Sequence, residues 1–386
     1  MRDDEHLRHE FLLRDDVVFL NHGSFGACPK PVFEAYQRWQ LELERQPVAF
    51  FQSRTRLLPE ARASLAAYAG CDRDDLVFIP NATTGVSAVA RSLPLAEGQE
   101  VLATDHEYGA CDRAWQLACR RSGARYVKVA VPLPVTSTDE VVDAIWRGVT
   151  ARTRVLFLSH ITSPTALIFP VRELVRRARE AGILTVIDGA HAPGQVELGL
   201  EELGADFYAG NCHKWLCAPK GSGFLYVRRE HQEMLVPPIT SWGHVVEAGK
   251  PNAFVDEFEW QGTRDLAPYL AVPAAIEYQR SREWPAVQRR CHRMAAWVRR
   301  AILDLYGLEP FAPDSEAFYA QMVAVPLPGC DVQVVKRGLM EEFGVEIPIL
   351  VWQGRQLVRV SVQGYTSQQE LETLVKALEV VLPPTP

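Results

Sequence analysis

The pattern of apolar and polar positions divides the chain into two parts. Between residues 76 and 227, short runs that are apolar throughout alternate with segments of helical period. Such runs are typical of parallel strands that helices cover on both faces. The predicted strands span residues 76–80, 100–104, 154–159, 183–187, 206–208 and 223–227. This part therefore predicts an α/β unit with a mostly parallel sheet.

The pattern changes after about residue 265. The predicted elements there are a long helical stretch over roughly 268–306, a strand at 322–327, a helix over 331–344, a strand at 357–362 and a last helix that a capping box at Ser367–Glu370 opens. We expect a large domain over residues 16–265. A smaller α+β domain should span residues 266–386, with residues 1–15 packed on it.

Length and charge narrow the class of protein. The chain has 386 residues, of which 47% are hydrophobic and 23% charged, as in an ordinary globular protein larger than a single core. Its net charge of −7, without a block of five lysines or arginines, disfavours a nucleic-acid groove. The charged N-terminus has no signal-peptide core, and no apolar run is long enough to predict a membrane span. Eight scattered cysteines without a CxxC pair predict a reduced, cytoplasmic protein.

Polar side chains gather just after the predicted strands. They are Asn81 with Thr83 and Thr84, His106 with Tyr108, Asp188 with His191, and His213 with Lys214. Because the carboxyl ends of parallel strands meet at one edge of a sheet, these groups should share a rim. Each one alone has an ordinary explanation, such as a helix cap at Asn81 or a surface position for Lys214. A single cofactor would account for all of them together.

Pyridoxal 5′-phosphate (PLP) is the cofactor that suits this set. It needs a lysine amine for covalent attachment, an acid beside its ring nitrogen and an anion site for its phosphate. Lys214 and Asp188 supply the first two groups. The helix start at Thr83–Thr84 offers free N–H groups and hydroxyls for the third. No metal is expected.

Seven motifs then make the sequence similar to a known family. They are FLNHGSFGACP (19–29), NATTGV (81–86), DHEYGA (105–110), VIDGAHAPG (186–194), YAGNCHKWLCAPKGSGFL (208–225), QGTRD (261–265) and VRVSVQGYT (358–366). The chain resembles fold-type I, class V aminotransferase-like PLP enzymes, and among them the isopenicillin N epimerase-like group. The resemblance implies a PLP-dependent transferase fold with a large α/β domain and a smaller α+β domain.

The resemblance also assigns roles to residues. It implies that Lys214 anchors the cofactor, that Asp188 pairs with the pyridine nitrogen, and that His191 lies near the phenolic oxygen. The phosphate would be held by Thr83, Thr84, Asn211 and His213, and by Gly262 and Thr263 of the other subunit of a homodimer. Arg359 would grip the α-carboxylate of an amino-acid substrate, and Asn21, His22 and Gly23 would border its pocket. Either His106 or Tyr108 would stack on the cofactor ring.

Two departures from related enzymes matter. Ala166 stands where many relatives carry glycine, which weakens the case for Thr162 or Ser163 as cofactor contacts. The related cysteine desulfurases carry a catalytic cysteine before the RxS strand, whereas the corresponding segment here, VEIPILVWQGRQL, has none, and Cys330 lies before the preceding helix. A desulfurase that forms a persulfide is therefore disfavoured.

Several reactions remain open after deprotonation at Cα by Lys214. The first candidate is C–S β-elimination from an S-substituted cysteine, because it needs only one base. Epimerisation of the isopenicillin N type follows closely and needs a second acid, for which His22, His106 and Tyr108 are candidates. Transamination is third, and a catalytically silent PLP-binding sensor is the alternative outside enzymology. We expect Trp215 to pack, and loops at 47–56 and 237–244 to complete the pocket.

Overall fold

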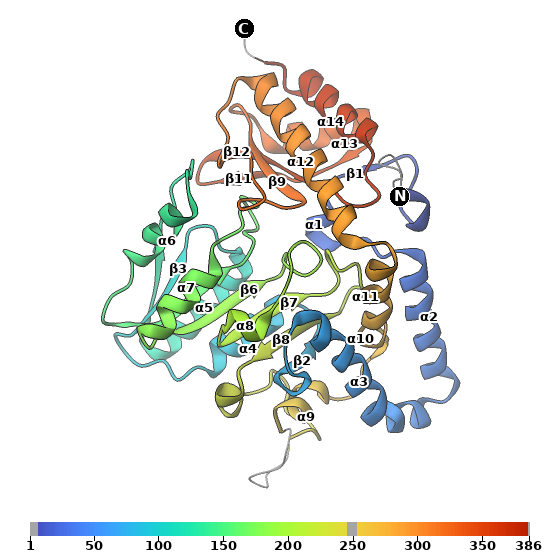
Figure 1. The fold of residues 1–386 in the computed structure, drawn as a ribbon, viewed down its shortest axis with the longest axis vertical. Coiled ribbons are helices and arrows are strands. Elements are labelled where there is room, and N and C mark those ends of the chain that lie inside the picture. Colours follow the sequence, from blue (N-terminus) through green and yellow to red (C-terminus); the bar gives the residue numbers. More distant parts are fainter. Residues whose placement is uncertain (1–6, 245–252, 385–386) are drawn as a thin grey trace.

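A seven-stranded sheet forms the centre of the larger part of the computed structural model, which describes residues 7–244 and 253–384 (Figure 1). The strands are β2 (Leu76–Ile79), β3 (Glu100–Thr104), β4 (Arg125–Val129), β5 (Thr153–Ser159), β6 (Leu184–Gly189), β7 (Phe207–Asn211) and β8 (Gly223–Val227). Their order is β2-β8-β7-β6-β5-β3-β4, and only β8 runs antiparallel to its neighbours. The predicted α/β unit with a mostly parallel sheet is confirmed.

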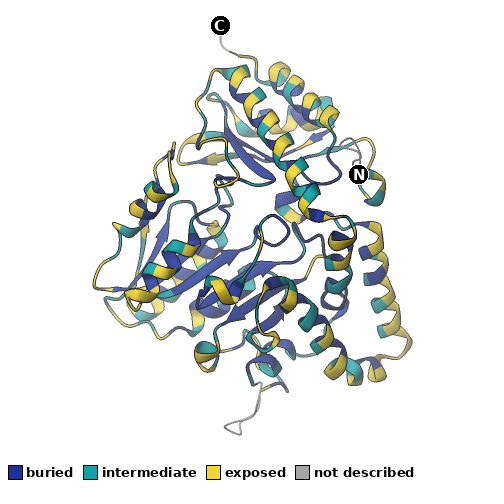
Figure 2. Ribbon diagram, in the orientation of Figure 1, coloured by how far each residue is buried: buried dark blue, intermediate teal, exposed yellow. Residues whose placement is uncertain are grey.

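Burial explains why the strands read as apolar runs. Every residue of β2, β3, β7 and β8 is buried, and Figure 2 shows the sheet as the buried centre of this part. Strand β4 is more exposed and was not predicted, because RYVKV lacks an apolar run. The helices connecting and flanking these strands are α4 (Ala82–Ser92), α5 (Gly109–Ser122), α6 (Thr138–Trp146), α7 (Val171–Glu180), α8 (Leu200–Leu203) and α9 (Ala253–Glu259), with 3-10 turns η2 (Arg73–Asp75) and η3 (Arg229–Met234).

Four further helices pack at one edge of the sheet. They are α2 (Lys30–Arg45), α3 (Pro47–Ala69), α10 (Ala267–Leu270) and α11 (Val272–Ser281). Residues 47–56 were expected to be a loop and instead begin α3, whose Pro47 occupies the first turn, where the missing N–H costs nothing. The predicted helix over 268–306 is broken, because Glu283 adopts a left-handed conformation (φ 49°) before α12 (Trp284–Tyr306).

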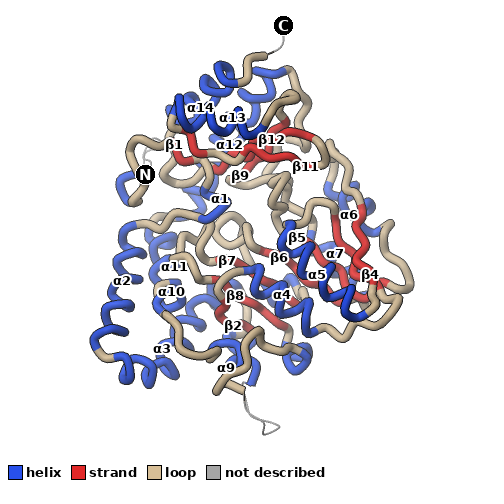
Figure 3. The backbone as a smooth tube through the Cα atoms, turned by 180° about the vertical axis from the view of Figure 1, so that it is seen from behind, coloured by secondary structure: helices blue, strands red, loops and turns tan. Residues whose placement is uncertain are grey.

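The smaller part is an antiparallel sheet covered by helices. Its strands are β9 (Met322–Pro326), β11 (Ile349–Trp352) and β12 (Arg355–Ser361), in the order β11-β12-β9, and α12, α13 (Val332–Phe343) and α14 (Gln368–Val381) accompany them (Figure 3). The predicted capping box at Ser367–Glu370 is present. The sequence placed the domain boundary at residue 266. In the structure α10 and α11 still pack on α2 and α3 of the larger part, and α12 is the first helix that packs on the smaller sheet.

The N-terminal segment joins this smaller part. Strand β1 (Val18–Phe19) pairs in parallel with β10 (Val345–Glu346), and the Leu7 N–H donates to the Gly364 carbonyl at 2.8 Å, close to the turn η1 (Arg8–Glu10). Residues 1–6 lie outside the described residues. The segment after β1 continues into the short helix α1 (His22–Phe25), which carries it toward the larger part.

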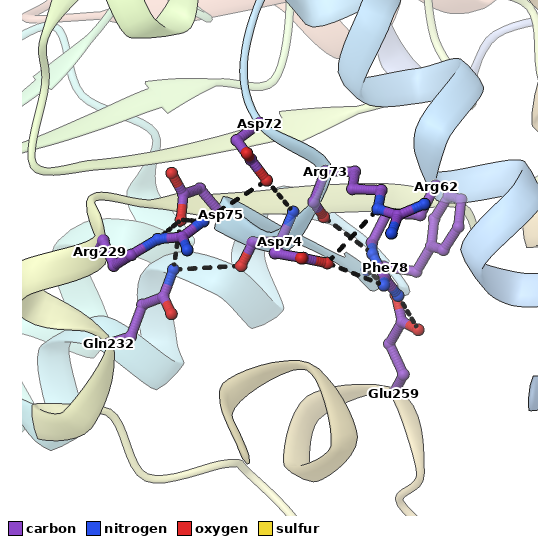
Figure 4. Close-up of polar contacts among 9 residues, drawn as sticks. All are labelled: Arg62, Asp72, Arg73, Asp74, Asp75, Phe78, Arg229, Gln232 and Glu259. Carbon is purple, nitrogen blue, oxygen red and sulfur yellow. Dashed lines mark hydrogen bonds and ion pairs between the residues drawn. The ribbon is translucent and has the colours of Figure 1, made fainter. Parts of the chain in front are cut away.

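A buried ion pair fixes α9 against α3. Arg62 of α3 contacts Glu259 of α9 at 2.7 Å, and both side chains are almost fully buried (Figure 4). Arg62 also donates to the Arg73 carbonyl at 2.8 Å, and Glu259 accepts the Phe78 N–H of β2 at 3.3 Å. Within residues 7–244 and 253–384, no helix has both the length and the apolar character needed to span a membrane.

Candidate active site

A cavity of about 300 Å³ opens beyond the carboxyl ends of strands β2, β5, β6 and β7. This is where ligands bind in open α/β sheets. Its wall consists of Ser24, Phe25, Pro80, Asn81, Ala82, Thr83, Tyr108, Ser159, Ile161, Ser163, Asp188, Ala190, His191, Asn211, His213, Lys214 and Gly221. Most of the rim that the strand ends predicted therefore lies in one cavity wall, whose residues come from seven separate segments of the chain.

Lys214 lies in this wall, three residues after β7 ends. Its Nζ is 3.3 Å from Nε2 of His191. Burial lowers the pKa of Lys214 to about 8, and the positive charge of Arg359 acts in the same direction. At pH 7 such a lysine is neutral in about a tenth of the molecules, against well under about one in a thousand at its ordinary pKa, and attachment to an aldehyde and proton abstraction both require the neutral amine.

Asp188 stands at the end of β6, at the bottom of the cavity. One carboxylate oxygen accepts the Ala190 N–H at 2.9 Å, and the thiol of Cys111 donates to the other at 3.4 Å. Burial raises its pKa. A buried carboxylate with one weak thiol donor has capacity left for a protonated ring nitrogen.

A second buried carboxyl, that of Glu107, interacts electrostatically with Asp188 and had no predicted role. Glu107 accepts the Thr104 hydroxyl at 2.6 Å and both the N–H (2.8 Å) and the hydroxyl (2.6 Å) of Ser159. Burial, with a smaller contribution from the charge of Asp188, raises its pKa to about 7. The sequence indicated Glu107 only through its position after β3, between the candidate residues His106 and Tyr108.

The start of α4 forms one end of the cavity. Asn81 caps the helix by accepting the Thr84 N–H at 2.9 Å, and the Asn211 side-chain oxygen accepts the Ala82 N–H at 2.8 Å. Thr83 lies in the wall, whereas the Thr84 hydroxyl bonds to Asn81 at 3.2 Å. A helix start of this kind suits an anion, because its N–H groups carry partial positive charge.

His213 lies beside this helix start. Its Nδ1 must carry the hydrogen, because its partner at 2.9 Å is the Ser222 carbonyl, which can only accept. Burial lowers the pKa of His213 to about 4. Its Nε2 remains for a phosphate oxygen, and the charge of that group would favour the protonated ring.

Arg359 of β12, in the smaller part, contacts two residues of the cavity wall without lining the cavity itself. Its Nη1 donates to the Ser163 carbonyl at 2.7 Å and its Nη2 to the Ser24 hydroxyl at 3.1 Å. Its Nε is buried and has no hydrogen-bond partner among the described residues, and burial lowers the pKa of Arg359 to about 10. Within the part of the chain that the structure describes, neutral oxygens hold this buried guanidinium and no carboxylate pairs with it, so a substrate carboxylate would supply a counter-ion. Ser163 and Ser24 were not predicted in these roles.

The segment Asn21–Gly23 supports the cavity without lining it. Asn21 accepts the Ser24 hydroxyl at 2.5 Å, and the Gly23 N–H donates to Ser361. His22 is buried, with Nδ1 3.1 Å from the Tyr365 hydroxyl and Nε2 3.0 Å from the Lys214 carbonyl. Ser24 and Phe25, directly after this segment, form the wall, and the bordering role of Asn21–Gly23 stays a prediction.

His106 is buried in the core, whereas Tyr108 lies in the cavity wall. Both ring nitrogens of His106 are engaged, Nδ1 with the Thr165 hydroxyl at 2.7 Å and Nε2 with the Val131 carbonyl at 2.8 Å. Its ring is fully buried 4.4 Å from Trp352 and lies outside the cavity wall. The stacking and acid roles considered for His106 therefore do not fit, and Tyr108, which lies in the wall and is 47% exposed, takes its place as candidate.

The remaining predicted residues lie elsewhere. Gly262 (φ 98°) and Thr263 follow α9 and are not part of this chain's cavity wall. Arg54 and Trp242, from the two segments expected to complete the pocket, line a separate cavity beside Trp260 instead. In the 160–167 segment, Ala166 adopts a left-handed conformation (φ 56°), so alanine occupies a backbone geometry that glycine favours.

These residues fit PLP on the evidence of the cavity itself. The amine of Lys214 and the buried carboxylate of Asp188 lie in the cavity wall, and the start of α4 forms part of the same wall. Arg359, which has no carboxylate partner among the described residues, contacts two further residues of the wall. The fold and the site together define a PLP-dependent enzyme of fold type I. A family model described as aminotransferase class-V matches residues 28–374. The chain belongs to this family, which confirms the expected fold, cofactor and enzyme class.

Relatives and solved structures agree with this membership. An isopenicillin N epimerase of Amycolatopsis lactamdurans is 37% identical over 96% of this chain and 97% of the relative. A probable chloroplastic L-cysteine desulfhydrase of Arabidopsis thaliana is 30% identical over 89% of this chain and 77% of the relative. The apo structure of a cysteine desulfurase from Thermococcus onnurineus NA1 has a TM-score of 0.84 at 21% identity and covers 97% of each chain.

Proposed function

We propose that this protein is a PLP-dependent lyase that removes the Cα proton of an S-substituted cysteine and eliminates its sulfur substituent. When bound, PLP supplies a sink for the negative charge that forms at Cα. Arg359 holds the substrate carboxylate, and Lys214 takes the Cα proton. The C–S bond then breaks with its electron pair on sulfur, and hydrolysis yields pyruvate, ammonia and a thiol.

One observation carries the ranking of elimination above epimerisation. Elimination needs a single base, and Lys214, with its lowered pKa, lies in the cavity wall. Epimerisation also needs an acid on the far face of the substrate. Two of the three candidates, His22 and His106, are buried outside the wall with both ring nitrogens engaged. The desulfhydrases among the relatives support the same reaction type.

Epimerisation is the second candidate, and a specific observation favours it. Tyr108 lies in the wall, and its hydroxyl is the one candidate acid from the sequence that remains there. The epimerases are also more similar to this chain than the desulfhydrase is, at 37% against 30% identity. Isopenicillin N itself therefore belongs among the test substrates.

The experiment separates the two reactions. The purified protein is incubated with S-substituted L-cysteines, L-cysteine and isopenicillin N in deuterated water, and pyruvate, Cα deuteration and configuration are followed. Pyruvate without inversion supports the lyase. Deuterated product of inverted configuration, without pyruvate, replaces it with the epimerase, and Tyr108→Phe should then abolish inversion. A protein that binds PLP but changes no amino acid would support a silent sensor.

Assembly and location complete the proposal. We infer a cytoplasmic homodimer in which Gly262 and Thr263 reach the phosphate site of the other subunit, because both lie outside this chain's own cavity wall and Thr263 is exposed. Sedimentation of the full-length protein tests the dimer. A mixed dimer of Lys214→Ala and Thr263→Glu subunits tests the shared site, because one of its two sites would combine both defects and the other would carry neither.

A further inference from the structure

The indole of Trp215 makes a hydrogen bond that reaches the reacting centre. Trp215 follows Lys214 directly, is fully buried, and its Nε1 lies 3.2 Å from Nδ1 of His191. An indole nitrogen can only donate, so Nδ1 of His191 must accept. A neutral imidazole then carries its single hydrogen on Nε2. The contact therefore selects one of the two tautomers of His191.

That tautomer directs a donor at Lys214. Nε2 of His191 lies 3.3 Å from Nζ of Lys214. With its hydrogen on Nε2, the ring can bond only to an amine that has a free lone pair. An ammonium group would place two donors face to face. Burial lowers the pKa of His191 well below its usual value, so the ring stays neutral.

The surroundings hold Trp215 in this position. Its carbonyl accepts the Gln279 side-chain N–H at 2.7 Å, and its ring lies 5.0 Å from that of His22. Gly194, at the end of the segment that carries Asp188 and His191, approaches so closely that a Cβ there would be 2.2 Å from the Trp215 carbonyl oxygen. The segments after β6 and β7 thus interlock at Trp215.

We infer that Trp215 is a positioning residue that fixes His191 as a hydrogen-bond donor toward Lys214 and keeps the lysine amine neutral before the cofactor attaches. The same donor suits the phenolic oxygen of PLP once it is bound. The tautomer rests only on contacts within this chain, whereas its use in catalysis rests on the proposed function.

The first test reads the tautomer in the wild-type protein and uses a variant only to assign the signals. Full-length protein with ¹⁵N-labelled histidine is examined by NMR with and without PLP, and the His191 signals are identified by their loss in His191→Gln. We expect an unprotonated, hydrogen-bonded Nδ1 and a protonated Nε2. A hydrogen on Nδ1 would overturn the inference, whether or not PLP binds.

The second test compares two matched substitutions. Trp284 donates its indole N–H to the Gly194 carbonyl at 3.0 Å, on the same segment but away from His191. In Trp215→Phe the freed imidazole can move its hydrogen to Nδ1 and accept from a lysine ammonium. The pH midpoint for covalent attachment of PLP to Lys214 should then rise by about one pH unit, the size expected for one hydrogen bond. Trp284→Phe should leave it unchanged.

The possible outcomes distinguish a failure of the positioning role of Trp215 from a failure of the proposed function. Equal shifts in the two variants, or none in Trp215→Phe, overturn the positioning role. A wild-type protein that shows the expected tautomer but never attaches PLP sinks the proposed function and leaves the tautomer standing. If Trp215→Phe does not fold, the wild-type spectrum still decides.

Discussion

Removing Arg62 should destabilise the protein strongly, because it leaves a carboxylate buried without its partner. Its Nη1 is 2.7 Å from Glu259, and the two side chains are 4% and 7% exposed. Breaking a buried pair from one side costs about 3–5 kcal/mol, whereas replacing both partners by apolar groups is often neutral. We therefore expect Arg62→Met to lower the free energy of unfolding by about 3–5 kcal/mol, and Arg62→Met/Glu259→Met to recover most of it.

Substituting Glu259 should lower the free energy of unfolding less than substituting Arg62 does. After Glu259→Gln, Arg62 keeps the Arg73 carbonyl at 2.8 Å and Asp74 at 3.5 Å, and the new amide oxygen can still accept the Phe78 N–H (Figure 4). This change should cost about 1–2 kcal/mol, as for a hydrogen-bonded group that loses one partner.

The loss should also depend on pH. Burial raises the pKa of Glu259, and the charge of Arg62 opposes that rise, so Arg62→Met moves the folded-state pKa further up. A carboxyl whose folded pKa lies above its unfolded value stabilises the fold less as the pH rises through that interval. The difference between Arg62→Met and wild type should therefore grow from pH 5 to pH 8.

Urea denaturation at the two pH values is the assay. Arg56→Met, the same change on the same helix, is the control, because Arg56 pairs with Glu60 on the surface and should matter by less than about 0.5 kcal/mol. A loss of stability in Arg62→Met no greater than in this control, or equal at both pH values, would show that Glu259 is not left as an unpaired buried carboxylate.

Three further predictions concern the site. The rate at which the cofactor-free protein attaches PLP should rise with pH and level off above about 8, because the neutral amine of Lys214 is the nucleophile. Stopped-flow absorbance measures this rate, and a midpoint near about pH 10, the ordinary value for lysine, would contradict the prediction. Asp188→Asn should keep the cofactor but lower kcat by about 10²–10³-fold, as expected for a lost charge partner at the reacting centre; steady-state assays of PLP-loaded protein test this. Arg359→Lys should raise KM by about 10–100-fold with a smaller effect on kcat, because an ammonium cannot bond both Ser163 and Ser24 while binding a carboxylate. An unchanged KM would argue against Arg359 as the residue that binds the substrate carboxylate.

The sequence predicted the rim of the site because sheet geometry is regular. Lys214, Asp188 and Thr83 each follow a strand, and the carboxyl ends of parallel strands meet. It could not choose between His106 and Tyr108, because the turn after β3 points the first into the core and the second into the cavity. Side-chain direction in a turn depends on distant packing, here on Trp352 from the smaller part.

Two other failures have distinct physical reasons. The start of α3 was taken for a loop because PVAFFQSRTR has no clear apolar stripe, and its helicity comes from packing against α2, α10 and α11. The bond from Trp215 to His191 joins two loops and depends on the side-chain angles of both, which leave no periodic trace in the sequence. Tertiary packing, rather than local propensity, decides both features.

The pairing of β1 with β10 gives the smaller part a second link to the cavity. After this strand pair the chain continues into α1, and Ser24 of α1 accepts a hydrogen bond from Arg359 of β12. The smaller part is therefore linked to the cavity wall both by the backbone that follows β1 and by the side chain of Arg359. A ligand that joins Arg359 to Lys214 would add its binding free energy to the docking of these parts, by thermodynamic linkage. Local opening of β10 should therefore report on occupancy of a cavity that this strand never touches.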